Sequence, residues 1–173
     1  SMENGLFGLS KILKDNEGNG ALKLELSTPG EKRLWYIADA FRRGWSMEEI
    51  FVSCKVDRWF LHQIKEIIDL EKQIEEIGLS QIDKNFMLQL KKKGFADARI
   101  ANLLNMSEED VRNHRYNLDV HPVFKRVDSC SAEFDSTTNY LYSTYDEENE
   151  SEVSENKKVI VLGSGPNRIG QGI

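Results

Sequence analysis

The sequence has few cysteines and prolines and no long apolar run. Its 173 residues include three prolines and two cysteines, Cys54 and Cys130, with no Cys-x-x-Cys motif and no histidine at metal-ligand spacing. This excludes a disulfide framework and a structural zinc site, and it indicates reduced thiols of the cytoplasmic type. No segment reaches the roughly 18 apolar residues of a membrane helix, and the first residues lack the basic start of a secretion signal. We therefore expect a cytoplasmic protein that does not contact a membrane.

An excess of basic charge is also missing. The formal net charge is −6, but the acidic residues are concentrated in residues 146–158, where six of them accompany two lysines. Residues 31–126 contain 17 basic and 16 acidic residues, so this part of the chain is close to neutral. A neutral body provides no field that would hold a nucleic acid. We therefore expect no nucleic-acid partner.

Apolar residues recur at helical spacing from Glu31 onward, and capping residues and glycines divide the pattern into helices. Ser46 and Glu49 form a capping box, while Asp57 and Ser107 are suited to begin further helices. The predicted helices cover residues 31–43, 46–54, 57–77, 83–93, 96–104 and 107–116, and a shorter helix is expected around residues 6–13.

These helices repeat. An offset of 50 residues aligns glycines, aromatic residues, capping residues and core positions together. The aligned pairs are Gly44 with Gly94, Trp45 with Phe95, Ile50 with Ile100, Asp57 with Ser107, and Leu61 with Val111. The pattern indicates a duplicated three-helix unit and predicts a mainly α, pseudo-symmetric helical bundle around one core.

The remaining segments are extended or polar. Pro122 disfavours a helix, and Tyr140, Tyr142 and Thr144 alternate with Leu141 and Ser143, a period of two that indicates a strand. The chain is therefore divided into a leader (1–30), a helical bundle (31–120), an extended arm (121–145), an acidic linker (146–157) and a β-strand with a glycine-rich turn (158–173).

The glycine-rich turn matches neither common phosphate-binding pattern. Arg168 occupies the position of the third glycine in Gly-x-Gly-x-x-Gly, and Gln171 and Gly172 replace the lysine and hydroxyl of a phosphate loop. The helix that should cover this strand is missing, and a lone strand cannot satisfy its backbone without neighbours. We therefore expect a piece of a longer polypeptide, in which an α/β domain begins at residue 158.

No residue set points to catalysis. His62, His114 and His121 are not arranged with a serine or cysteine, and no carboxylates form an acid–base pair. We predict no catalytic, cofactor-binding or metal-binding residue in this chain. Trp35, Trp45 and Phe51 are expected to form an apolar patch for association.

One alternative remains open, a helix-turn-helix nucleic-acid-binding module from Ala98 to Arg115. Its second helix begins with Glu108, Glu109 and Asp110, which phosphate would repel. The first hypothesis therefore remains a structural module.

Seven separated blocks resemble one family. In order they are 34–42 (LWYIADAFR), 57–61 (DRWFL), 90–97 (LKKKGFAD), 121–128 (HPVFKRVD), 132–134 (AEF), 142–145 (YSTY) and 165–172 (GPNRIGQG). These blocks are similar to the central region of the large subunit of carbamoyl-phosphate synthase. The resemblance extends from about residue 30 to the end, whereas the leader contains no matching block.

The resemblance implies a helical oligomerization domain between two homologous ATP-using halves. On this basis residues 31–120 are the oligomerization domain and residues 158–173 begin the second synthetase half. Residues 1–30 are either the tail of the preceding half or a divergent loop. The parent enzyme is expected to be an ATP- and Mg-dependent ligase that makes carbamoyl phosphate from bicarbonate and glutamine-derived ammonia, for arginine and pyrimidine synthesis. Its expected partners are further copies of itself and a glutaminase small subunit. The chain alone is expected to be inactive and to hold no cofactor.

Overall fold

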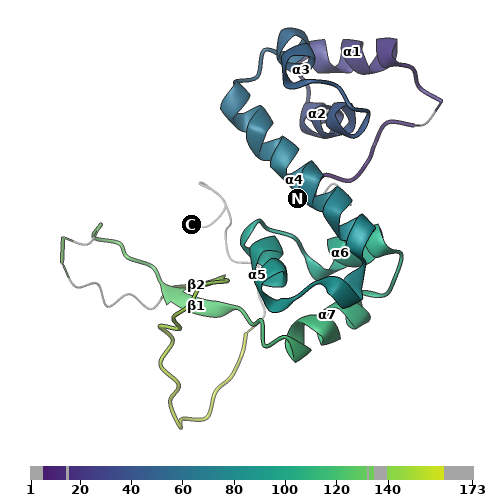
Figure 1. The fold of residues 1–173 in the computed structure, drawn as a ribbon. Coiled ribbons are helices and arrows are strands. Elements are labelled where there is room, and N and C mark those ends of the chain that lie inside the picture. The colour runs from purple at the N-terminus through teal and green to yellow at the C-terminus, as the bar shows by residue number, and fades with distance from the viewer. Residues whose placement is uncertain (1–5, 15, 132, 135–139, 162–173) are drawn as a thin grey trace.

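The computed structural model describes residues 6–14, 16–131, 133–134 and 140–161 (Figure 1). Helices dominate this part of the chain, which confirms the mainly α prediction. The elements are α1 (Asn19–Ser27), α2 (Arg33–Arg42), α3 (Met47–Cys54), α4 (Arg58–Ile77), the 3-10 turn η1 (Leu79–Gln81), α5 (Lys84–Lys92), α6 (Asp97–Leu104), α7 (Glu108–Asn117), β1 (Val123–Arg126) and β2 (Leu141–Thr144).

The capping residues begin the helices where the sequence predicts. The backbone N–H of Ser46 donates to Glu49 Oε2 at 2.8 Å, and the backbone N–H of Glu49 donates to Ser46 Oγ at 3.3 Å. Asp57, Asp83 and Ser107 each accept a backbone hydrogen bond with their side chains at the start of α4, α5 and α7. These bonds satisfy N–H groups that have no partner inside the helix.

The duplication is present in the backbone. Helices α2, α3 and the start of α4 recur 50 residues later as α5, α6 and α7. Gly44 and Gly94 follow the first helix of each unit with φ values of 81° and 88°, which glycine adopts without a steric cost. The next residues, Trp45 and Phe95, each donate a backbone hydrogen bond of 3.0 Å to the carbonyl five positions earlier. The two turns are therefore copies of each other.

Two hydrophobic cores form where one was expected, and α4 contributes to both (Figure 1). Leu61, Ile64 and Ile68 belong to the first core, whereas Leu70 and Ile74 belong to the second. A helix of 20 residues is about 30 Å long, which is more than one three-helix unit can cover. Each unit therefore buries its own section of the shared helix.

The leader packs differently from the prediction. No helix forms at residues 6–13, and the first helix is α1. Leu13, Leu22 and Leu26 are all buried in the first core. The Asp39 carboxylate accepts hydrogen bonds from the backbone N–H groups of Ile12 and Leu13 at 3.0 and 2.8 Å. Because the Asp39 side chain satisfies these N–H donors, the segment does not need the backbone hydrogen bonds of a helix.

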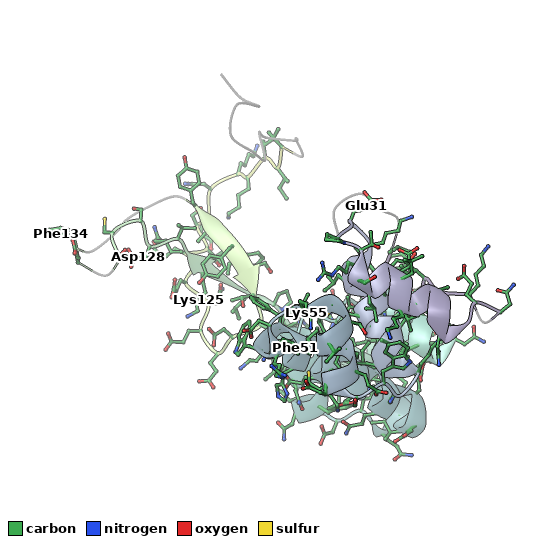
Figure 2. The ribbon with its side chains drawn as sticks, turned by 90° about the horizontal axis from the view of Figure 1, so that it is seen from above. Glu31, Phe51, Lys55, Lys125, Asp128 and Phe134 are labelled. Atoms are coloured by element: carbon green, nitrogen blue, oxygen red, sulfur yellow. The ribbon has the colours of Figure 1, made fainter. Side chains whose placement is uncertain are left out.

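The arm is a two-stranded antiparallel sheet in which Val123 is opposite Thr144 and Arg126 is opposite Leu141. This confirms the predicted extended segments. Figure 2 shows Phe134 and Asp128 at the far end of the arm, away from the helices. The predicted strand at residue 158 does not form in residues 158–161, where the valine and isoleucine side chains are exposed. The glycine-rich turn and the rest of that prediction lie outside the described residues.

Candidate functional site

The three histidines are dispersed. His62 is exposed, His114 Nε2 lies 2.8 Å from the carbonyl oxygen of Ile82, and His121 stacks on Tyr116. Among the described residues, no group of three or more His, Cys, Asp or Glu side chains could hold a metal ion. No helix in this part of the chain has the length and apolar content needed to cross a membrane. That the chain has no catalytic or cofactor-binding residue stays a prediction.

The helix-turn-helix alternative gains no support. Helices α6 and α7 do pack against each other, but Arg99 and Arg115 are buried in ion pairs. Arg112 pairs with Glu108 at 2.6 Å on the surface of α7. Because these arginines are already paired within the fold, they are not presented to phosphate groups.

A cluster of four charged side chains, which we call the junction cluster, connects the two helical units. Glu71 of α4 is at its centre and is nearly fully buried. Its Oε2 accepts from Arg42 Nη2 at 2.7 Å, and its Oε1 accepts from Arg99 Nε and Nη2 at 2.8 and 2.5 Å. Arg42 also pairs with Asp39 at 2.7 Å. Helices α2 and α6, which belong to different units, are therefore bound to the same carboxylate.

The leader closes over the junction cluster. Arg42 donates to the carbonyl of Leu9, Asp39 holds the two N–H groups described above, and Arg99 Nη1 donates to Ser10 Oγ at 3.2 Å. The leader therefore contacts both units. Buried charges are costly unless they are paired and hydrogen-bonded, and here the leader backbone completes the pairing.

A second buried cluster fixes the last three helices. Asp97 of α6 accepts from Lys91 Nζ at 2.9 Å and from Arg115 Nη2 at 2.9 Å, and Arg115 also donates to the carbonyl of Val120 at 2.8 Å. Burial acts to raise the pKa of Asp97, but the hydrogen bonds from Arg115 and Lys91 outweigh it and hold that pKa below its ordinary value. Tyr145, just after β2, lies over Lys91 with 5.2 Å between Nζ and the ring centroid. The base of the arm is thereby attached to the second unit.

The expected apolar patch is in a different place. Trp45 and Phe51 pack against the first core, and Trp35 Nε1 donates to the carbonyl of Gly8 at 2.9 Å. Instead Trp59 and Phe60, at the start of α4, are 63% and 56% exposed. Phe60 falls at the helical spacing of the buried residues of α4, but it belongs to neither core.

Trp59 and Phe60, which we call the aromatic pair, make an edge-to-face contact. Their ring centroids are 4.9 Å apart and their planes are at 89°. Beside them, the Arg58 guanidinium lies 3.6 Å from the centroid of the Phe51 ring and pairs with Glu48 at 2.8 Å. The helical spacing does not mark this pair as exposed, because Phe60 is four residues before the buried Ile64 and falls on the same face of α4.

The chain matches one family model, and three similar proteins are named carbamoyl phosphate synthase large chain. The family described as "Carbamoyl-phosphate synthetase large chain, oligomerisation domain" matches residues 1–119, which include the leader. The chain is 51% identical to the carbamoyl phosphate synthase large chain of Pseudomonas syringae pv. tomato over 99% of its length, and 52% identical to that of Pseudomonas aeruginosa over 93%. The large chain of Neisseria meningitidis serogroup B is 51% identical over 99%.

The chain spans only 15–16% of the length of these relatives. The matched residues contain all seven helices of the described structure and the junction cluster. The family match and the high identity agree with the seven sequence blocks. The chain belongs to the oligomerisation-domain family of the carbamoyl-phosphate synthetase large chain.

Proposed function

We propose that this module has a structural function: it separates the two catalytic halves of the large chain and mediates self-association. The junction cluster supports the role of spacer. Its charged groups bind one another and the leader, and they connect both units to α4. Such an arrangement fixes orientation, because moving one unit would separate buried opposite charges.

The aromatic pair is the observation that supports self-association. Two large aromatic side chains stand exposed on the helical body, with an arginine and a glutamate beside them. Interfaces concentrate their binding energy in tryptophan, tyrosine and arginine residues surrounded by a polar rim. We propose that the aromatic pair lies at the centre of a contact between two copies of the chain.

Light scattering on the 173-residue chain tests this proposal. We expect the wild type to be an oligomer and the double variant Trp59→Ser/Phe60→Ser to form a smaller species. The matched control is Leu24→Ser, which removes another exposed apolar side chain, from α1. A wild type that stays monomeric at high concentration would refute self-association. An oligomer that resists the double variant but dissociates with the control would refute the choice of surface.

We also propose that the whole large chain makes carbamoyl phosphate from ATP, bicarbonate and glutamine-derived ammonia, in the cytoplasm, with Mg and a glutaminase small subunit. The same proposal includes the use of this carbamoyl phosphate in arginine and pyrimidine synthesis. The name carbamoyl phosphate synthase, which the relatives have, supports it. The described residues do not fit a magnesium site, because no three acidic or histidine ligands gather there.

The isolated chain is therefore expected to show no bicarbonate-dependent ATP hydrolysis. A rate above that of a buffer blank, lost on heat denaturation, would contradict this expectation. The domain boundaries at residues 31, 121, 146 and 158 remain part of the same proposal.

A further inference from the structure

The outer edge of β1 is closed by residues of the acidic linker. The backbone N–H of Phe124 donates to Asn149 Oδ1 at 3.0 Å, and its carbonyl accepts from the backbone N–H of Glu150 at 2.8 Å. The backbone N–H of Arg126 donates to Glu150 Oε2 at 2.7 Å, and Lys125 Nζ binds the same carboxylate at 3.1 Å. No further strand can pair with this edge without displacing the linker.

The outer edge of β2, in contrast, is not closed by the linker. Val127 and Tyr140 are opposite each other and share a backbone hydrogen bond of 2.8 Å. In an antiparallel pair, bonded and non-bonded positions alternate, so the backbone groups of Leu141 and Ser143 point away from β1. The sheet has two strands in the described part of the chain, and the sequence of β2, Leu-Tyr-Ser-Thr, contains no charge and no proline. Among the described residues, nothing pairs with this edge, so it is open to another strand.

The arm is also poorly covered. Tyr140, Leu141 and Tyr142 are 75%, 47% and 52% exposed. Both figures show the sheet beside the helices and not packed under them. A two-stranded sheet alone is at best marginally stable in water, and a third strand or a packing partner stabilises it. One open edge on an uncovered sheet therefore indicates a strand-pairing surface.

We propose that the open edge of β2 pairs antiparallel with the same edge of a second copy of this chain. A two-fold axis at Tyr142 brings Leu141 opposite Ser143 of the second copy, and the reverse. All four residues then exchange backbone hydrogen bonds, and the two Tyr142 side chains face each other as a cross-strand aromatic pair. The uncharged strand is complementary to itself, since no like charges meet across the axis.

The closed edge of β1 determines where assembly stops. Pairing through β2 gives a four-stranded sheet whose two outer strands are both β1, and both outer edges are occupied by Asn149 and Glu150. Growth of the sheet therefore ends at two copies and does not continue to a fibre. The inference rests on the proposed self-association, but it assigns a second surface, outside residues 1–119 that the family match covers.

Cross-linking of the 173-residue chain tests the pairing. Residues facing each other at a non-bonded position are about 4.5 Å apart between Cα atoms, within the range that a disulfide spans. In a Cys130→Ser background, we expect Tyr142→Cys to form a covalent dimer on oxidation. The control Tyr140→Cys, on the same face but opposite Thr144 of the second copy, should form none.

A proline variant provides the second measurement. Ser143→Pro removes an N–H that β1 does not use, so the hairpin remains, but the bond to a second copy is lost. We expect it to abolish the Tyr142→Cys cross-link, whereas Ser154→Pro in the linker should leave it unchanged. Equal cross-linking at positions 140 and 142, no cross-linking, or a cross-link that resists Ser143→Pro would overturn the pairing. If light scattering still shows a wild-type oligomer in those cases, the pairing fails and the proposed function stands.

Discussion

Glu71 is the residue whose loss should most destabilise the module. The residue is 3% exposed, and its carboxylate accepts hydrogen bonds from Arg42 and Arg99, which come from different units. The Glu71→Ala variant would leave Arg99 with the neutral oxygens of Ser10 and Asn102 as its partners among the described residues, in a site where its side chain is 8% exposed. Breaking a buried ion pair by removing one partner costs about 3–5 kcal/mol, because the remaining charge stays buried. We expect a loss of this size in the free energy of unfolding.

Urea unfolding followed by circular dichroism measures this loss. The matched control is Glu75→Ala, one turn later on α4 and exposed, for which we expect a change of less than about 0.5 kcal/mol. A third variant, Glu71→Leu/Arg99→Met, replaces both charges with apolar side chains and should recover most of the stability, as is common for buried pairs. If Glu71→Ala were no worse than the control, the junction cluster would not hold the two units together.

Three further predictions concern the turns, the caps and the second buried cluster. Replacing Gly44 or Gly94 by alanine forces a positive φ on a residue that has a Cβ. Each variant should lower the free energy of unfolding by about 1–2 kcal/mol, measured by thermal unfolding. A variant as stable as the wild type would show that the turn relaxes. Ser46→Ala removes the capping box and should cost about 1 kcal/mol in urea unfolding, mostly from the first unit. The pKa of Asp97 is lower in the folded state than in the unfolded state. The ionised carboxylate therefore stabilises the fold at pH values above its unfolded pKa of about 4, and this stabilisation is lost as the pH falls through its folded-state pKa. Asp97→Asn should therefore flatten the acid side of the stability profile, and an unchanged slope would contradict this.

Local signals explain how much of the fold could be predicted. Ser46, Asp57 and Ser107 act on the nearest backbone groups, and Gly44 and Gly94 meet a local need for positive φ, so their effects can be read from neighbouring residues. The leader could not be predicted in this way. Its structure depends on Asp39, more than 20 residues away, whose carboxylate satisfies the backbone of Ile12 and Leu13.

The candidate site was less predictable than the helices. The apolar patch was placed at Trp35, Trp45 and Phe51 because large aromatics favour interfaces, but two of these pack on the first core. The exposure of Trp59 depends on how the other helices of the first unit cover the start of α4, which is a property of tertiary packing. The junction cluster joins side chains 29 and 28 positions apart, and no local pattern marks such pairs.

The two repeated units are not equivalent at the position that binds the leader. Fifty residues after Asp39 the chain has Gln89, and fifty after Arg42 it has Lys92, so the second unit lacks both the carboxylate and the guanidinium that hold the leader. These two differences make the units distinct although their backbones repeat. Only the first unit has the carboxylate and guanidinium that bind the leader backbone, so the two units cannot be exchanged.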